Sequence, residues 1–546
     1  MTLPQFLARI GAVTAPLVAF AVLLAVSACE TAPVASGGQM QQKSASVVHQ
    51  SASAPTSLAS SSLASPSLAP QAEPPVIGQH PEFRRNEVKL VGDAPYSTFS
   101  MEVDTAAYSV VRRYLRGSTM PPPDAVRIEE MLNYFDYSYP EPDQAEDGLR
   151  PTLSLFPSPW KNDWAMLRIG VKAWTPPAGT RKPLNLVLLL DVSGSMSGPD
   201  RLELVQNSMP ILFKGLGAED RVALVTYSND VEVRQEPTTD HAKLLREIAS
   251  LQADGGTAGA AALQTAYGLA EEYLSDEREN RVLLLTDGDF NVGITDPRRF
   301  RNFVSEKRDT GIGLSVLGLG AGNFNDSLVQ TLVQAGNGTA AYIDDGAEAQ
   351  RLFRDGGVGL LYTVAADVKV QVEFNPDRIA AYRLVGYETR ALNTQDFLDE
   401  KKDAGEVGAG HAVTALYEVL PVEAAGKYLP TPRYSGNAPP AAAAGSLQNE
   451  WALVKLAYKS KVNGDQVVTT AVATPDMLIP VDGLSADDSL AAAVAAFGGK
   501  LRKEEDLSDF SYEAILRLVQ TARRHDPDGS RAELLQLVKA AEALDG

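Results

Sequence analysis

The sequence is poor in cysteine and in positive charge. Its 546 residues include one cysteine, Cys29, which excludes an internal disulfide and a metal site built from several cysteines of one chain. Its 49 Lys and Arg residues are outnumbered by 69 Asp and Glu residues, which gives a formal net charge of −20 at pH 7. Because a nucleic-acid-binding surface needs basic residues to meet the phosphates, we expect no nucleic-acid partner.

Several familiar site patterns are also missing. The chain contains no Walker phosphate loop, no dinucleotide fingerprint and no paired metal-binding histidines, and it has five histidines in all. The segment that starts at Asp287 begins like an EF-hand loop, but its glycine falls one place late, at Gly293. Arg298 occupies the position that needs a bidentate acid, so we expect no EF-hand there.

The amino end carries an apolar stretch typical of an export signal. Arg9 is the only charged residue among the first 28, and the segment from Ile10 to Ala28 is uncharged and mostly apolar. It ends in Val26-Ser27-Ala28-Cys29, which resembles the lipobox of bacterial lipoproteins. The resemblance implies acylation of Cys29 and a stable membrane anchor, since each buried methylene contributes about 0.8 kcal/mol. A membrane-spanning helix and a plain secretory peptide are the alternatives.

The composition changes after Cys29. Residues 31–75 are rich in Ser, Ala, Gln and Pro, and Lys43 and Glu73 are their only charged residues. Such a segment cannot bury enough apolar area to offset its ordering entropy, so we predict a flexible tether over residues 29–80. By the lipoprotein resemblance, Glu30 rather than Asp after the cysteine favours the outer membrane of the cell envelope, facing the periplasm, or the cell surface.

Residues 183–360 alternate between strand and helix patterns. Apolar runs of strand length cover Leu184 to Leu190, Arg221 to Tyr227, Arg281 to Thr286 and Gly313 to Leu319, with helical periodicity between them. This order predicts an α/β fold with a doubly wound, mostly parallel sheet, and ligands are expected at the carboxyl ends of its strands.

In the two flanks, apolar and polar residues alternate with a period of two. Ala165–Ala173 and Val368–Phe374 alternate like strands, within a predicted amino-terminal domain (residues 81–180) and a predicted β-rich carboxy-terminal domain (residues 365–480). We expect the flanks to pack together around the inserted α/β domain, because neither has enough strands for its own sheet. Residues 485–546 are predicted to be helical, with a solvated basic and acidic face that includes Arg502.

Oxygen-bearing side chains gather at three predicted strand ends or helix starts. Asp191-Val192-Ser193-Gly194-Ser195 follows the first strand, Gly255-Gly256-Thr257 precedes a helix, and Asp287 follows Thr286. Such ligands suit Mg²⁺, Mn²⁺ or Ca²⁺ rather than zinc. The candidate ligands are Asp191, Ser193, Ser195, Thr257 and Asp287. Helix capping and chain turning are the alternative role for each of them.

These pieces resemble the metal-ion-dependent adhesion site of the von Willebrand factor type A domain, and the resemblance covers about Pro183 to Phe353. It implies that Ser193, Ser195 and Thr257 coordinate the cation directly and that Asp191 and Asp287 act largely through water. One coordination position is then left for an acidic group of a protein partner. The flanks, at Ser97–Tyr139 and Phe374–His411, resemble the terminal domains of a group of bacterial type A lipoproteins.

The sequence leaves two other functions open. One is a hydrolase that uses the metal or Ser197, which stands in Gly194-Ser195-Met196-Ser197-Gly198. A serine hydrolase needs a histidine base, and His411 and His525 follow Ser197 in the chain. The other is a structural envelope protein whose cation only stabilises the fold. The resemblance favours an envelope lipoprotein that binds a protein partner and has no catalytic residues.

Overall fold

The computed structural model describes residues 83–177, 179–288, 297–320, 326–354, 357–399, 402, 404–429, 449–480 and 483–546. The export signal, Cys29, the predicted tether and the residues 289–296 that would continue an EF-hand loop lie outside these ranges. Within the described ranges, no helix is long and apolar enough to span a bilayer.

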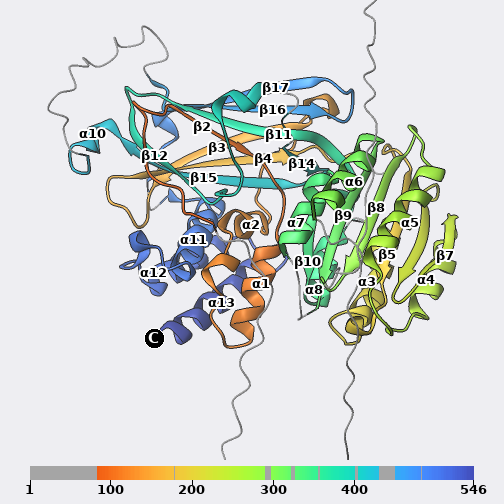
Figure 1. Ribbon diagram of the computed structural model, residues 1–546. Coiled ribbons are helices and arrows are strands. Elements are labelled where there is room, and N and C mark those ends of the chain that lie inside the picture. Colours follow the sequence, from red (N-terminus) through yellow and green to blue (C-terminus); the bar gives the residue numbers. More distant parts are fainter. Residues whose placement is uncertain are drawn as a thin grey trace, which may run out of the picture. The chain divides into compact units, whose positions relative to one another are not determined.

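The α/β domain is built on a six-stranded sheet with the strand order β10-β9-β8-β5-β6-β7 (Figure 1). Neighbouring strands are parallel except for β7, which runs antiparallel to β6. This confirms the predicted doubly wound sheet. The strands are β5 (Leu184–Asp191), β6 (Arg221–Tyr227), β7 (Val231–Thr238), β8 (Glu279–Thr286), β9 (Ile312–Leu319) and β10 (Ala340–Ile343).

Helices cover both faces of this sheet, as its uninterrupted apolar strands require. Leu186 and Leu188 of β5 face a core with α3 (Leu202–Lys214), α4 (His241–Ala249) and α8 (Gly346–Leu352). Val187 and Leu189 face the opposite core. The helices of that second core are α5 (Gly259–Glu272), α6 (Pro297–Asp309) and α7 (Asp326–Ala335).

The flanks form two further sheets, ordered β1-β12-β15-β4-β3 and β13-β2-β11-β16-β17, with β14 paired to β11. Their inner faces share one core, to which β4 contributes Ile169 and β11 contributes Val370. The strands before the α/β domain are β1 (Lys89–Leu90), β2 (Tyr96–Ser100), β3 (Leu149–Pro157) and β4 (Ala165–Ala173). Those after it are β11 (Thr363–Phe374), β12 (Ile379–Val385), β13 (Ala391–Leu392), β14 (Gly405–Gly408), β15 (Ala412–Pro421), β16 (Ala452–Ser460) and β17 (Gln466–Ala473).

Each sheet contains strands from both flanks. β4 pairs with β15, where Val171 lies opposite Val413, and β2 pairs with β11, where Phe99 lies opposite Val370. The predicted packing of the two flanks around the inserted domain is therefore confirmed. The segments that enter and leave the α/β domain also meet, because Trp174 O accepts a hydrogen bond from Gly410 N–H (3.2 Å) and Tyr362 O accepts one from the neighbouring Ala409 N–H (2.8 Å).

A second core in the flanks is helical. It contains residues of α1 (Ala106–Arg116), α2 (Ile128–Asn133), α11 (Ala486–Leu501), α12 (Tyr512–Ala522) and α13 (Ser530–Asp545). The short helices α9 (Val358–Leu361) and α10 (Val422–Ala425) complete the set of described α-helices. Almost every residue of α11 is buried, so this helix is a central element of the fold.

The prediction of a solvated face is wrong for Arg502, which follows α11. Its side chain is 4% exposed and pairs with Glu388 (2.5 Å) and Glu504 (3.3 Å). Charge spacing along the tail cannot reveal this burial, because Glu388 lies far away in the sequence.

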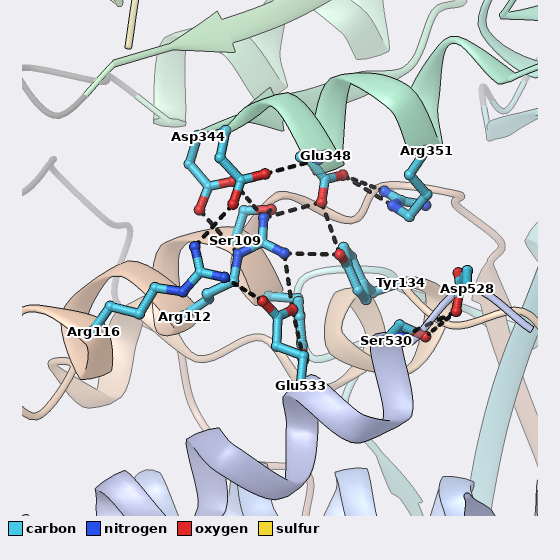
Figure 2. Close-up of polar contacts among 12 residues, drawn as sticks. Ser109, Arg112, Arg116, Tyr134, Asp344, Glu348, Arg351, Asp528, Ser530 and Glu533 are labelled. Carbon is cyan, nitrogen blue, oxygen red and sulfur yellow. Dashed lines mark hydrogen bonds and ion pairs between the residues drawn. The ribbon is translucent and has the colours of Figure 1, made fainter. Parts of the chain in front are cut away.

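Ion pairs join the α/β domain to the flanking helices around Arg112 of α1 (Figure 2). Its guanidinium donates to Asp344 (2.9 Å) and Glu348 (3.0 Å) of the α/β domain and to Glu533 of α13 (3.1 Å). Tyr134 accepts a further hydrogen bond from Arg112 and donates one to Glu348, both at 2.8 Å. The Arg112 side chain is 2% exposed, so this cluster is a buried charged contact between segments distant in sequence.

Candidate metal site

Asp191 is the last residue of β5, and its side chain is fully buried. One carboxylate oxygen, Oδ1, accepts a hydrogen bond from the Ser193 N–H (2.9 Å). The other, Oδ2, accepts hydrogen bonds from the hydroxyls of Tyr227 (3.0 Å) and Thr286 (3.1 Å). Three donors thus fix the orientation of the carboxylate at the carboxyl edge of the sheet.

The sequence did not single out Tyr227 and Thr286, the two hydroxyl donors to Asp191. They are the final residues of β6 and β8, the strands on either side of β5. Their position provides the one signal that could have found them, because the ends of neighbouring parallel strands converge at one edge of a sheet. The donating hydroxyls themselves are not visible in a strand pattern.

The two serines after β5 bring their hydroxyls together. Ser193 precedes a single 3₁₀ turn over Gly194–Met196, and the Ser193 and Ser195 Oγ atoms lie 3.0 Å apart. Ser193 is buried and Ser195 is half-buried. The turn therefore presents two neutral oxygen atoms from one short segment.

The loop that carries Thr257 is fastened to this turn. Gly194 N–H donates to Gly255 O (2.9 Å), and Gly256 N–H donates to Asn229 Oδ1 (2.7 Å). Gly255 has a φ of +84°, which a residue with a side chain rarely adopts, and an added Cβ would lie 2.7 Å from the Asn229 amide nitrogen. These contacts hold the loop with half-buried Thr257 beside the serine turn.

Asp287 places a second acid next to Asp191. It directly follows β8 and is 3% exposed. Burial raises the pKa of the Asp191 carboxyl above its ordinary value, hydrogen bonds from Ser193 lower it, and the charge of Asp287 raises it further. A bound cation would offset both the burial and the repulsion between the two carboxylates.

The donor set fits a hard divalent cation. It offers two carboxylates and several hydroxyls, the oxygen ligands that suit Mg²⁺, Mn²⁺ or Ca²⁺. No group of three or more His, Cys, Asp or Glu side chains in the described ranges could hold a metal ion, so a thiolate or imidazole site of that kind does not compete there. Neutral hydroxyl ligands would leave such a cation able to attract an external carboxylate.

The described histidines contact residues other than Ser197, and the Ser197 side chain is exposed. His241 Nε2 lies 2.9 Å from Asp220 O, and His411 packs against Gly359. Neither these two nor His525 is hydrogen-bonded to Ser197 in the part of the chain that the structure describes. The arrangement that a serine hydrolase needs is therefore not formed by these residues.

Comparison with known proteins places the chain in a family. The family model described as von Willebrand factor type A domain matches residues 186–289, the one described as von Willebrand factor matches residues 78–168, and the carboxy-terminal model of the uncharacterized protein YfbK matches residues 359–544. The chain is 36% identical over 478 residues to the uncharacterized protein YfbK of Escherichia coli (strain K12), which covers 86% of this chain and 82% of that protein. The chain belongs to the YfbK family of von Willebrand factor type A domain proteins.

Other proteins similar to this YfbK-family chain match a smaller part of it or have a lower sequence identity. It is 30% identical over 190 residues to the uncharacterized protein sll0103 of Synechocystis sp. (strain ATCC 27184 / PCC 6803 / Kazusa), covering 34% of this chain and 44% of that protein. Among solved structures, von Willebrand factor type A from Catenulispora acidiphila aligns with 73% of this chain and 91% of its own, at 15% identity and a TM-score of 0.39.

Proposed function

We propose that this YfbK-family protein binds a protein partner through a divalent cation held by Asp191, Ser193, Ser195, Thr257 and Asp287. The observation that carries the proposal is the pair of serine hydroxyls 3.0 Å apart, next to a buried carboxylate whose other contacts are already fixed. Membership of the type A family supports a role in protein–protein interaction.

The proposed ligands have two different roles in holding the cation. Asp191 and Asp287 supply negative charge at the sheet edge, and Asp191 is locked in place by its three donors. The serine and threonine hydroxyls supply neutral oxygens, which reduce the positive charge less than carboxylates do. The cation can therefore take an acidic group of the partner as a further ligand, and we propose Mg²⁺ or Mn²⁺, or alternatively Ca²⁺, as the ion.

Calorimetric titration of the chain with Mg²⁺ or Mn²⁺ tests the cation site. We expect binding by the wild type and none by Asp191→Ala, while Ser197→Ala, an exposed serine on the same turn, should bind as the wild type does. At a hundredfold excess over Kd, the bound cation should raise the free energy of unfolding by about 2.7 kcal/mol. No binding by the wild type at millimolar cation would contradict the proposal.

A crosslinking pull-down from envelope membranes, with and without chelator, tests the partner. We expect a protein that is captured with Mg²⁺ and lost with chelator or with Asp191→Ala. By the type A resemblance, Thr257→Ala should weaken the partner complex more than it weakens cation binding. A partner retained equally under all of these conditions would show that the interaction does not use the cation.

We also propose that the protein is lipid-anchored at Cys29, in the outer membrane facing the periplasm or at the cell surface. The sequence Val26-Ser27-Ala28-Cys29 after an apolar stretch supports this. Cys29→Ala should give an uncleaved or soluble chain on membrane fractionation. A variant that stays with the membranes at the mature mass would show that lipid at Cys29 is not the anchor.

A further inference from the structure

The three sheets end in six edge strands, and an unprotected edge can pair with another chain. β1 and β13 have two residues each, too few for extended pairing. The edge of β3 is occupied at Leu155, which bridges to Leu478 and whose carbonyl accepts a hydrogen bond from Ile479 N–H (2.9 Å). These three edges are therefore short or capped.

The two edges of the α/β sheet are protected in other ways. α1 packs on β10, and the Asp104 carboxylate accepts a hydrogen bond from the Ala340 N–H of that strand (2.9 Å). β7 has exposed charges at Glu232 and Arg234, contains Pro237 and shows two register shifts against β6. Charges, proline and irregular register are features that prevent edge-to-edge association.

β17 contacts β3 of the facing sheet, but it has no charge, proline or register shift to protect its outer edge. Its sequence from Gln466 to Ala473 contains no charged residue and no proline, and its register with β16 runs without a shift over eight residue pairs. Val468 is 50% exposed. No strand pairs with the outer edge of β17 among the residues that the structure describes.

The unpaired backbone groups of β17 can be assigned from one hydrogen bond. Ser460 N–H of β16 donates to Asp465 O (2.9 Å), so the backbone groups of 465 and of alternate residues after it face β16. The N–H and C=O groups of Gln466, Val468, Thr470 and Val472 therefore face outward. This is a row of donors and acceptors about 20 Å long, ready to accept a strand.

We propose that two copies of this chain associate through β17, antiparallel and with Thr470 opposite Thr470 of the second copy. In this register Val468 lies opposite Val472 of the second copy on the outer face, and β-branched pairs of this kind stabilise antiparallel strands. The same residues contribute from both copies, as a two-fold interface requires.

The strand itself sets no local charge barrier to a second copy as the occupant. The chain carries a formal net charge of −20, yet no charge lies between Asp465 and Asp476. Two copies of this neutral strand bring no like charges opposite each other, and the strand offers a charged partner nothing to recognise. One strand pair is a small interface, so the association is weak in solution and depends on concentration.

Crosslinking tests the proposed register. In the full chain with Cys29→Ala, the thiol introduced by Thr470→Cys is the only one. Hydrogen-bonded antiparallel neighbours have Cα atoms about 5.5 Å apart, which suits a disulfide. We expect mild oxidation to give a covalent dimer that increases with protein concentration.

Thr469→Cys is the matched control, because it lies on the other face of the strand and opposite Ala471 of the second copy. It should stay monomeric under the same oxidation. Equal dimer from both variants, or dimer from Thr469→Cys alone, would overturn the proposed pairing.

Sedimentation of chains without an introduced cysteine provides a second measurement. Thr470→Glu places two like charges opposite each other in the dimer and should weaken the dimer roughly tenfold. Within one chain the exposed Thr470 lies opposite Lys455 of β16, so the new carboxylate faces a cation and the melting temperature should stay that of the wild type. A wild-type chain that is monomeric at all concentrations would overturn the proposal. None of these outcomes depends on the metal site, so the two proposals can fail separately.

Discussion

At the scale of single residues, the main conflict in the site is the buried charge of Asp191. A carboxyl whose pKa is raised in the folded state stabilises the fold below its ordinary pKa, and this contribution is lost as the pH rises through the raised value. At neutral pH the ionised Asp191 therefore costs stability when no cation is bound. In the proposed function, the same charge that limits the stability of the chain alone attracts the cation.

Asp191→Asn should raise the melting temperature without Mg²⁺ and abolish the shift that the proposed cation site predicts on addition of Mg²⁺. The amide oxygen can still accept from Ser193 N–H, and the amide nitrogen can donate to the Tyr227 and Thr286 hydroxyls, which can also act as acceptors. Thermal unfolding with and without Mg²⁺ measures both effects, with Ser197→Ala as the control. A variant that is less stable than the wild type without Mg²⁺ would show that the buried carboxylate does not destabilise the fold.

His411 should make the stability depend on pH. Burial lowers the pKa of His411 to about 4, and the charges of Lys172 and Arg351 act in the same direction. Between pH 6.5, its ordinary pKa, and about 4, the unfolded chain binds more protons, so the free energy of unfolding falls as the pH drops through this window.

Urea unfolding across this window should show a smaller loss for His411→Gln than for the wild type. His525→Gln, at an exposed position, should leave the wild-type dependence unchanged. An equal loss in the wild type and in His411→Gln would assign the pH dependence to other groups.

At the scale of elements, two of the three arginines of α1 have very different expected contributions to stability. Arg112→Met should lower the free energy of unfolding by about 3–5 kcal/mol, because it leaves Asp344 and Glu348 buried without their shared cation. Arg116→Met, whose wild-type side chain is 51% exposed and paired with Asp345 and Glu533, should cost about 0–1 kcal/mol. Urea unfolding measures the free energy of unfolding of both variants. Equal losses would mean that the buried cluster does not stabilise the contact between the α/β domain and the flanking helices.

The elements of the α/β domain could be predicted closely, because their strands are uninterrupted apolar runs. The strand expected over Arg221–Tyr227 has those bounds in the structure. In β7 only Val231 and Val233 are apolar residues that alternate with polar ones, so the sequence pattern can indicate only the start of this exposed edge strand. Strand ends located the candidate Asp191 and serine ligands, but Tyr227 was missed because its role depends on a hydroxyl contact across strands.

At the scale of the whole molecule, the pairing of the flanks could be predicted only in outline. A two-residue period shows that β4 and β15 are strands, but it does not show that they are neighbours, because the α/β domain lies between them in the sequence. The burial of α11 likewise depends on partners from both ends of the chain, including Ile128 and Ile515.

A chain that ends after Gly483 should therefore fail to fold. Without α11, α12 and α13, the helical core of the flanks loses its centre, and Phe156 and Met166 of the strands lose their covering. A chain without Leu544–Gly546, which are all exposed and whose removal breaks one side-chain hydrogen bond, from Tyr512 to Asp545, should melt close to the wild type. Circular dichroism and solubility distinguish the two, and a stably folded chain ending at Gly483 would show that the strands do not need the helices.

The hydrogen bonds from Ala409 to Tyr362 and from Gly410 to Trp174 hold the two ends of the α/β domain together. This contact has a consequence for the order of folding. Pairing β4 with β15 before the α/β domain has formed requires closure of a very long loop, which is entropically costly and slow. If the inserted domain folds first, its two ends come together and replace this loop by a short bridge. We therefore expect refolding to be sequential, with the parallel sheet early and the flanking sheets late, after the last helices of the chain are available.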